Sequence, residues 1–190
     1  MVRTGLLIAA LLAVGCEAKL PPESTFIGRV SGSDAVFALA IAEDRAVGYS
    51  CGGQDSLEQL TMWFSGEVHW YSDGSLHVDC GDFHLHAFVG DQISGGVISL
   101  KDGSSHDFIA SAIEDDGVGG VYSDGVDPCP TGAIVYRNDE GEIAVQGAYC
   151  AGVFRQVTPM SPMLTESGIA VEVPFDTDTR WGVHLQPLAL

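Results

Sequence analysis

Basic residues are scarce in this sequence. Its 190 residues include eight lysines and arginines against 26 aspartates and glutamates, so the formal net charge at pH 7 is −18. Nucleic acids and anionic lipid headgroups attract proteins through clustered lysine and arginine, and no such cluster occurs here. The composition argues against a nucleic-acid partner. Because 46% of the residues are hydrophobic, the chain is expected to fold rather than to form an acidic disordered tail.

Long apolar segments are missing as well. The most apolar run covers about eleven residues, 4–14, whereas a transmembrane helix needs about 20. Arg3 precedes this run and the small residue Gly15 follows it. A charged head, a short apolar segment and a small residue are typical of a secretory signal peptide. We therefore predict a signal peptide over residues 1–15, and we expect any membrane attachment to depend on something other than a spanning helix.

A cysteine, Cys16, stands directly after this segment. The arrangement resembles the lipobox of bacterial lipoproteins, although Ala13 occupies the position where leucine is most common and Leu12 lies one residue further upstream. The resemblance implies cleavage before Cys16, acylation of that residue, and a lipoprotein anchored in the bacterial cell envelope, at either the inner or the outer membrane. Residues 16–23 would then form a lipidated tether. An ordinary secretion signal cut after residue 15 or 18 is the alternative.

Sustained helical periodicity is absent from the rest of the chain. Turn signals rich in glycine, aspartate and serine recur about every eight to twelve residues, and the apolar stretches between them, such as 26–30 and 108–113, alternate as strands do. This pattern predicts an all-β domain over residues 24–175, an antiparallel meander of about 10–12 strands forming a barrel or a sandwich. One short helix is expected after the capping-box sequence Asp55-Ser-Leu-Glu58. Residues 176–190 have no clear period and are expected as a C-terminal extension.

Cysteines are few, and none occurs in a Cys-x-x-Cys pair, which argues against a zinc site of four thiolates. If Cys16 carries lipid, the remaining Cys51, Cys80, Cys129 and Cys150 form an even set, as exported proteins use for disulfides. Three connectivities are possible. We predict 51–80 and 129–150, because the segment between the last two cysteines has the pattern of a hairpin.

Histidines concentrate in residues 76–86, which hold three of the six in the chain. A two-residue turn at Cys80-Gly81 would place His77 opposite His84. Strand alternation then puts five polar residues on one face, namely His77, Asp79, Asp82, His84 and His86. Imidazoles and carboxylates bind divalent transition metals, and the candidate metal ligands are His77, Asp79, His84 and His86. The alternative is a solvent-facing side of a hairpin that is polar without binding anything.

Four short motifs are similar to those of small secreted bacterial β domains of unknown function. They are Phe26-x-Gly-x-Val30, Ser33-Asp-Ala35, Tyr49-x-Cys51-Gly and Trp63-Phe-x-Gly66. The resemblance implies a β meander and adds no activity.

No catalytic residue is predicted. Gly48-Tyr-Ser-Cys-Gly52 matches the Gly-x-Ser-x-Gly pattern of serine hydrolases, but the parallel sheet on which that serine depends is not indicated. The sequence favours a non-enzymatic, lipid-anchored envelope domain that binds a ligand or a protein partner and carries no cofactor. The competing hypothesis is a metal-binding protein or metal-dependent hydrolase that uses the histidine face and a divalent metal.

Overall fold

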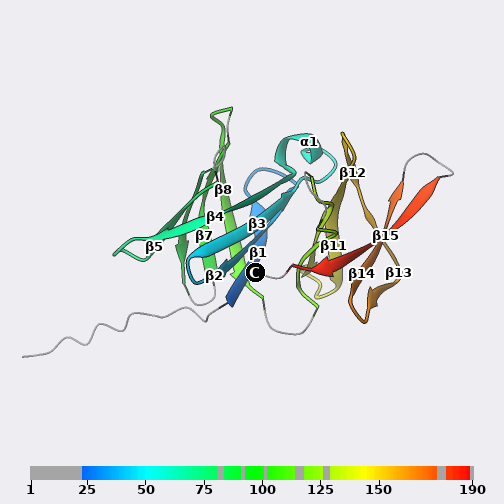
Figure 1. Cartoon of the computed structure of the whole chain (residues 1–190). Helices are drawn as coiled ribbons and strands as arrows, with labels where there is room; N and C mark the ends of the chain where they lie inside the picture. The colour runs from blue at the N-terminus through cyan, green and yellow to red at the C-terminus, as the bar shows by residue number, and fades with distance from the viewer. Residues whose placement is uncertain are drawn as a thin grey trace, which may run out of the picture.

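The protein is built almost entirely of β-strands. The computed structural model describes residues 23–80, 84–90, 93–100, 102–113, 118–125, 129–174 and 179–188, which contain fifteen strands and one short helix (Figure 1). The first eight strands form a closed barrel. They are β1 (Glu23–Val30), β2 (Val36–Ala42), β3 (Arg45–Cys51), β4 (Met62–Trp70), β5 (Ser75–Asp79), β6 (His84–Val89), β7 (Ile93–Ser99) and β8 (Ser105–Ala112). The expected all-β antiparallel fold is confirmed, with more strands than the 10–12 expected.

The barrel is a simple meander. Each strand pairs antiparallel with the next, and β1 also pairs with β8 to close the ring. Glycine is required at this closing seam, because a Cβ atom on Gly28 would lie 1.8 Å from the carbonyl oxygen of Ile109. Any side chain there would push the two strands apart.

The remaining strands form a second sheet, nearly closed on itself, beside the barrel (Figure 1). Its order is β12-β11-β10-β9-β15-β14-β13, so the last strand inserts between β9 and β14. Residues 180–187, within the stretch expected as a C-terminal extension, supply this strand. The strands are β9 (Gly120–Ser123), β10 (Gly132–Arg137), β11 (Ile143–Cys150), β12 (Phe154–Gln156), β13 (Thr158–Thr165), β14 (Gly168–Pro174) and β15 (Arg180–Pro187).

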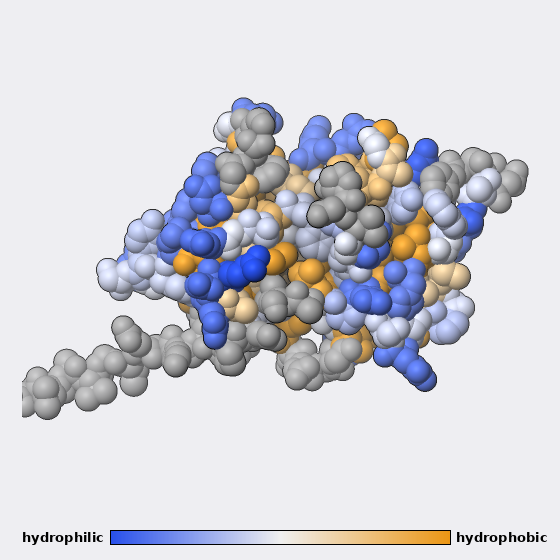
Figure 2. Space-filling view, viewed as in Figure 1, coloured by the Kyte–Doolittle hydropathy of each residue, from blue (hydrophilic) through white to orange (hydrophobic). Residues whose placement is uncertain are grey.

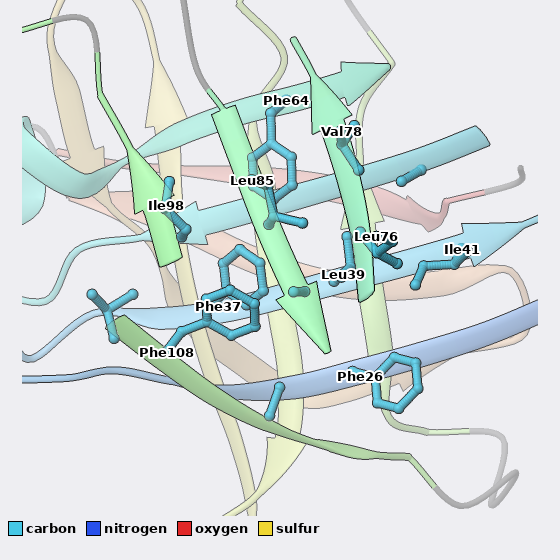
Figure 3. Close-up of a cluster of buried hydrophobic side chains, with 14 of the residues drawn as sticks. Phe26, Phe37, Leu39, Ile41, Phe64, Leu76, Val78, Leu85, Ile98 and Phe108 are labelled. Carbon is cyan, nitrogen blue, oxygen red and sulfur yellow. The ribbon is translucent and has the colours of Figure 1, made fainter. Parts of the chain in front are cut away.

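Three phenylalanine rings pack together inside the barrel (Figure 3). Phe37 on β2 stacks on Phe64 with ring centroids 5.5 Å apart, and its centroid lies 4.4 Å from that of Phe108. Aliphatic side chains from all eight strands complete this core, including Leu39, Leu76 and Leu85. Burial of so much apolar surface is the main stabilising contribution to the barrel.

A second apolar cluster joins the barrel wall to the neighbouring sheet. Ile27, Val36 and Tyr49 point outward from the barrel and pack against Val121 and Ile134. Polar contacts cross the same boundary: the Trp63 indole N–H donates to the carbonyl oxygen of Pro130 at 3.0 Å. In the view of Figure 2, hydrophobic residues show mainly between the two halves, and hydrophilic residues cover much of the barrel face. The two halves therefore share a buried interface.

The helix is shorter than the capping sequence suggests. Helix α1 (Leu57–Leu60) has Ser56 as its N-cap residue, without a side-chain capping bond. The Ser56 hydroxyl donates instead to the carboxylate of Asp34, which also accepts from the backbone N–H of Gly53 at 3.1 Å and of Asp55 at 2.8 Å. One carboxylate thus holds the whole loop that precedes the helix.

This arrangement predicts a pH-dependent contribution to stability. The hydrogen bonds from Ser56 and the backbone of Asp55 hold the pKa of Asp34 below its ordinary value of 3.8. A carboxyl group with a lowered pKa in the folded state stabilises the fold above its unfolded pKa, and that stability is lost as pH falls through the folded pKa. We expect Asp34→Ala to lower the free energy of unfolding by about 1–2 kcal/mol at pH 7. The difference from the unmodified protein should shrink below about pH 4, measured by urea denaturation across pH.

Asp44→Ala is the matched control, because the structure shows no side-chain hydrogen bond for this exposed turn residue among the residues it describes. An equal effect of both substitutions, or a difference that does not change with pH, would contradict the role of Asp34.

One of the two expected disulfides is present. Cys129 and Cys150 are bonded, with Cα atoms 5.8 Å apart, so that pairing is confirmed. The expected Cys51–Cys80 bridge is wrong, because both thiols are free. Their side chains lie in different clusters: Cys51 belongs to the apolar cluster between the barrel and the sheet, and Cys80 packs against the barrel core. Burial raises the pKa of Cys51 to about 12 and that of Cys80 to about 11, so both stay protonated near neutral pH.

The predicted signal peptide, Cys16 and the tether up to residue 22 lie outside the described residues. Among the residues that the structure does describe, no helix has the length and apolar content needed to cross a bilayer.

Candidate metal centre

The candidate site lies on the hairpin of β5 and β6. Along both strands, apolar and polar residues alternate, so Leu76, Val78 and Leu85 are buried in the barrel core. The residues between them point away from the core, because successive side chains of a strand point to opposite faces. Four candidate ligands therefore share the outer face of the barrel, as the alternation predicts: His77, Asp79, His84 and His86.

The register of the hairpin differs from the expected one. His77 pairs with His86 rather than with His84, and Asp79 pairs with His84. The segment between the strands is four residues long, 80–83, instead of a two-residue turn. Relative to the expected pairing, β6 is displaced by two residues along β5. A shift of two positions keeps every side chain on its face, whereas a shift of one would have reversed the faces.

Three of the four candidates converge. Ligand atoms of His77, Asp79 and His84 all lie within 4.8 Å of one another. The Nδ1 atom of His84 is 3.6 Å from Oδ1 of Asp79, and the rings of His77 and His84 stack with centroids 5.8 Å apart and planes inclined by 18°. The cross-strand pair and the diagonal neighbour thus form a compact group of two imidazoles and one carboxylate.

This geometry is close to that of a divalent metal site. Zinc binds imidazole nitrogen and carboxylate oxygen at about 2.0–2.2 Å, which places tetrahedral ligand atoms about 3.3–3.5 Å from one another. The 3.6 Å separation of the His84 and Asp79 atoms already meets that requirement closely. Ligand atoms of the group that lie up to 4.8 Å apart must approach by up to about 1.5 Å, a movement within the rotamer freedom of the partly exposed His77 side chain. Three protein ligands leave a coordination position for water or for a ligand from outside.

His86 does not join this group. Its ring lies edge-on against the exposed ring of Phe88, with centroids 5.6 Å apart. The site that the structure supports is therefore smaller than the four-residue set expected from the sequence.

The sequence analysis did not identify a fourth histidine beside this hairpin, on the neighbouring strand β4. His69 on β4 pairs directly with His77, so His69, His77 and His86 form a row across three neighbouring strands. The turn after β4 is the signal that could have shown this. A turn at residues 71–75 makes Trp70 the partner of Leu76, and the next pair outward is His69 with His77.

The electrostatic setting favours a cation. The chain carries a formal charge of −18, and such a field attracts cations and repels anions. The side chains of His84 and Asp79 are 51% and 58% exposed, so a metal can reach them from solvent without opening the barrel.

The serine of the hydrolase-like motif is placed differently. Ser50 lies within β3 between two antiparallel neighbours and is buried. No strand-to-helix turn presents its hydroxyl, so the motif does not form the strained turn that the pattern requires.

Comparison of the chain with protein-family models, with curated protein sequences and with solved structures gives no significant match.

Proposed function

We propose that this protein is a lipid-anchored cell-envelope β-barrel protein that binds a divalent transition metal ion on the outside of the barrel. The observation that carries the proposal is the convergence of His77, Asp79 and His84 within 4.8 Å on one hairpin. Two imidazoles and one carboxylate suit zinc, and also copper or nickel, better than calcium or magnesium, which prefer oxygen ligands.

Binding is favoured over catalysis by the exposure of the ligands. Metal-dependent hydrolases hold the metal in a cavity that excludes bulk water and orients the substrate. Here two of the three ligand side chains are more than half exposed, on the outer wall of the barrel. We therefore propose capture or exchange of the metal at the envelope surface rather than hydrolysis.

Zinc titration of the full-length protein tests the site. A His77→Ala/His84→Ala variant should bind zinc at least 100-fold more weakly in isothermal titration calorimetry. Loss of a residue that merely orients a metal ligand costs about 10–100-fold in affinity, so loss of two ligands should cost at least that much. The unmodified protein should bind one zinc ion at this site.

His86→Ala is the matched control, since this residue lies on the same face and hairpin but outside the group. The zinc affinity of the His86→Ala variant should stay within about threefold of the zinc affinity of the unmodified protein. If His86→Ala weakens binding as much as the double substitution, or if the double variant binds as well as the unmodified protein, the proposed ligand set is wrong.

The proposed lipid anchor at Cys16 is supported by the amino-acid sequence alone. Arg3, the short apolar run and Gly15-Cys16 support cleavage before Cys16 and acylation of that residue. Two or three acyl chains would hold the protein firmly at a membrane, because a single chain binds only marginally. We expect the mature protein from a bacterial host to begin at Cys16 and to carry the lipid mass, and Cys16→Ser to leave the membrane fraction. Mass spectrometry showing an unmodified N-terminus after residue 15 or 18 would contradict the anchor.

A further inference from the structure

A pocket of about 370 Å³ lies where the barrel meets the second sheet, away from the histidine face. The barrel contributes residues from β1, β2 and β8, and the sheet contributes the end of β10 and the turn that follows it. The volume falls in the lower part of the range of small-molecule sites, roughly 300–1,000 Å³. The pocket therefore suits a ligand of about the size of a small aromatic acid.

The floor of the pocket is apolar. Ile27, Val36, Ile113 and the ring of Tyr136 line it, and all four belong to the cluster that joins the barrel to the sheet. Ile27 and Val36 are buried members of that cluster, and Ile113 and Tyr136 pack against it. An apolar floor of this kind receives the hydrocarbon part of a ligand.

Two arginines line the same pocket, Arg29 from β1 and Arg137 from β10, and both are exposed to solvent. Arg137 donates to the carbonyl oxygen of Gly141 at 3.1 Å, which orients it at the pocket edge. The side chain of Arg29 makes no hydrogen bond or ion pair with any residue that the structure describes. Among the residues that the structure describes, no carboxylate competes with a ligand for the Arg29 side chain.

We propose that this pocket binds a small organic carboxylate through Arg29, with the apolar part of the ligand on Ile27 and Tyr136. Guanidinium groups recognise carboxylates by two parallel hydrogen bonds. A single negative charge fits better than a phosphate dianion, because Asp139 is among the lining residues of the pocket and the whole chain is strongly acidic. A small hydrophilic anion such as acetate has little apolar surface to bury against this floor, so it should bind only weakly.

The test is calorimetric titration of the full-length protein with three probes that share one aromatic body. They are 3-phenylpropanoate, 3-phenylpropanol and phenyl phosphate, measured with EDTA present so that the metal site plays no part. The carboxylate should bind at least about tenfold more tightly than the alcohol, since a charge-assisted pair is lost in the alcohol. It should also bind more tightly than the phosphate.

Arg29→Gln should weaken binding of 3-phenylpropanoate about tenfold or more and leave the affinity for 3-phenylpropanol unchanged. Arg45→Gln, an exposed arginine of the barrel outside the pocket, is the matched control and should change neither. Urea midpoints of both variants equal to that of the unmodified protein will show that the fold is kept. Arg29→Lys keeps the positive charge but loses the two parallel hydrogen bonds of the guanidinium group. Its affinity for 3-phenylpropanoate should lie between that of the unmodified protein and that of Arg29→Gln. Equal binding of the acid and the alcohol, tighter binding of the phosphate, or full affinity in Arg29→Gln would overturn the proposal.

Discussion

Phe37→Ala is expected to lower the free energy of unfolding by about 3–5 kcal/mol. Phe37 is fully buried in the barrel and contacts the rings of both Phe64 and Phe108. The substitution removes the middle ring of the three, and the strands cannot collapse into the space because the barrel is closed by hydrogen bonds on every side. Loss of apolar transfer energy and the cavity left behind therefore add together. Equilibrium urea denaturation measures the change.

Phe88→Ala is the control for this substitution. Phe88 is a ring of the same kind on the same barrel, but it is 54% exposed on the outer face. Its removal should change the free energy of unfolding by no more than about 0.5 kcal/mol. Similar midpoints for the two variants would mean that the ring of Phe37 does not lie in the barrel core as described.

Removal of the disulfide is expected to cost about 3 kcal/mol. The Cys129–Cys150 bond closes a loop with a sequence separation of 21 residues and holds the start of β10 near the end of β11. Opening the loop increases the conformational entropy of the unfolded chain, which favours unfolding. A Cys129→Ser/Cys150→Ser variant should therefore unfold at lower urea concentration than the unmodified protein.

Reduction supplies the internal check. Under dithiothreitol, the unmodified protein should lose stability until its midpoint matches that of the double serine variant, whose midpoint should not change. Cys51 and Cys80 are free in both proteins and contribute nothing to the difference. A reduced protein as stable as the oxidised one would show that this bond does not constrain the fold.

The barrel could be predicted from the sequence largely because its strands follow one another as hairpins. Alternation in stretches such as 76–79 and 84–88 indicates which side chains face the core, and local turns join them. The second sheet is harder to predict. β12 is only three residues long, β13 contains two prolines with an irregular register, and β15 pairs with β9 across about sixty residues of sequence. Neither short strands nor distant pairings leave a periodic signal.

The metal candidates illustrate the same limit. Strand alternation was sufficient to put His77, Asp79 and His84 on one face, since shifting the pairing of two strands by two residues leaves every side chain on the same face. Which of these side chains lie close together depends on the length of the loop between β5 and β6, and the alternation of polar and apolar residues does not predict that length. The separation of His86 from the group and the pairing of His69 with His77 both follow from register.

The disulfide error has a related cause. Cysteine counting suggested two bridges, but a bond also requires both side chains on the same side of the barrel wall. Cys51 faces the second sheet and Cys80 packs against the barrel core. The pocket with Arg29 lay beyond sequence reasoning altogether, because it forms only where β1 and β8 of the barrel meet β10 of the sheet.

Binding of a divalent metal on the outer face of the barrel can be observed directly in a crystal structure of the protein grown with zinc, with data collected on both sides of the zinc absorption edge. We predict one anomalous peak bounded by His77, Asp79 and His84, with metal–ligand distances of about 2.0–2.2 Å. His86 should remain against Phe88, outside the coordination sphere. A peak coordinated by other residues, or no peak at this hairpin at saturating zinc, would contradict the account.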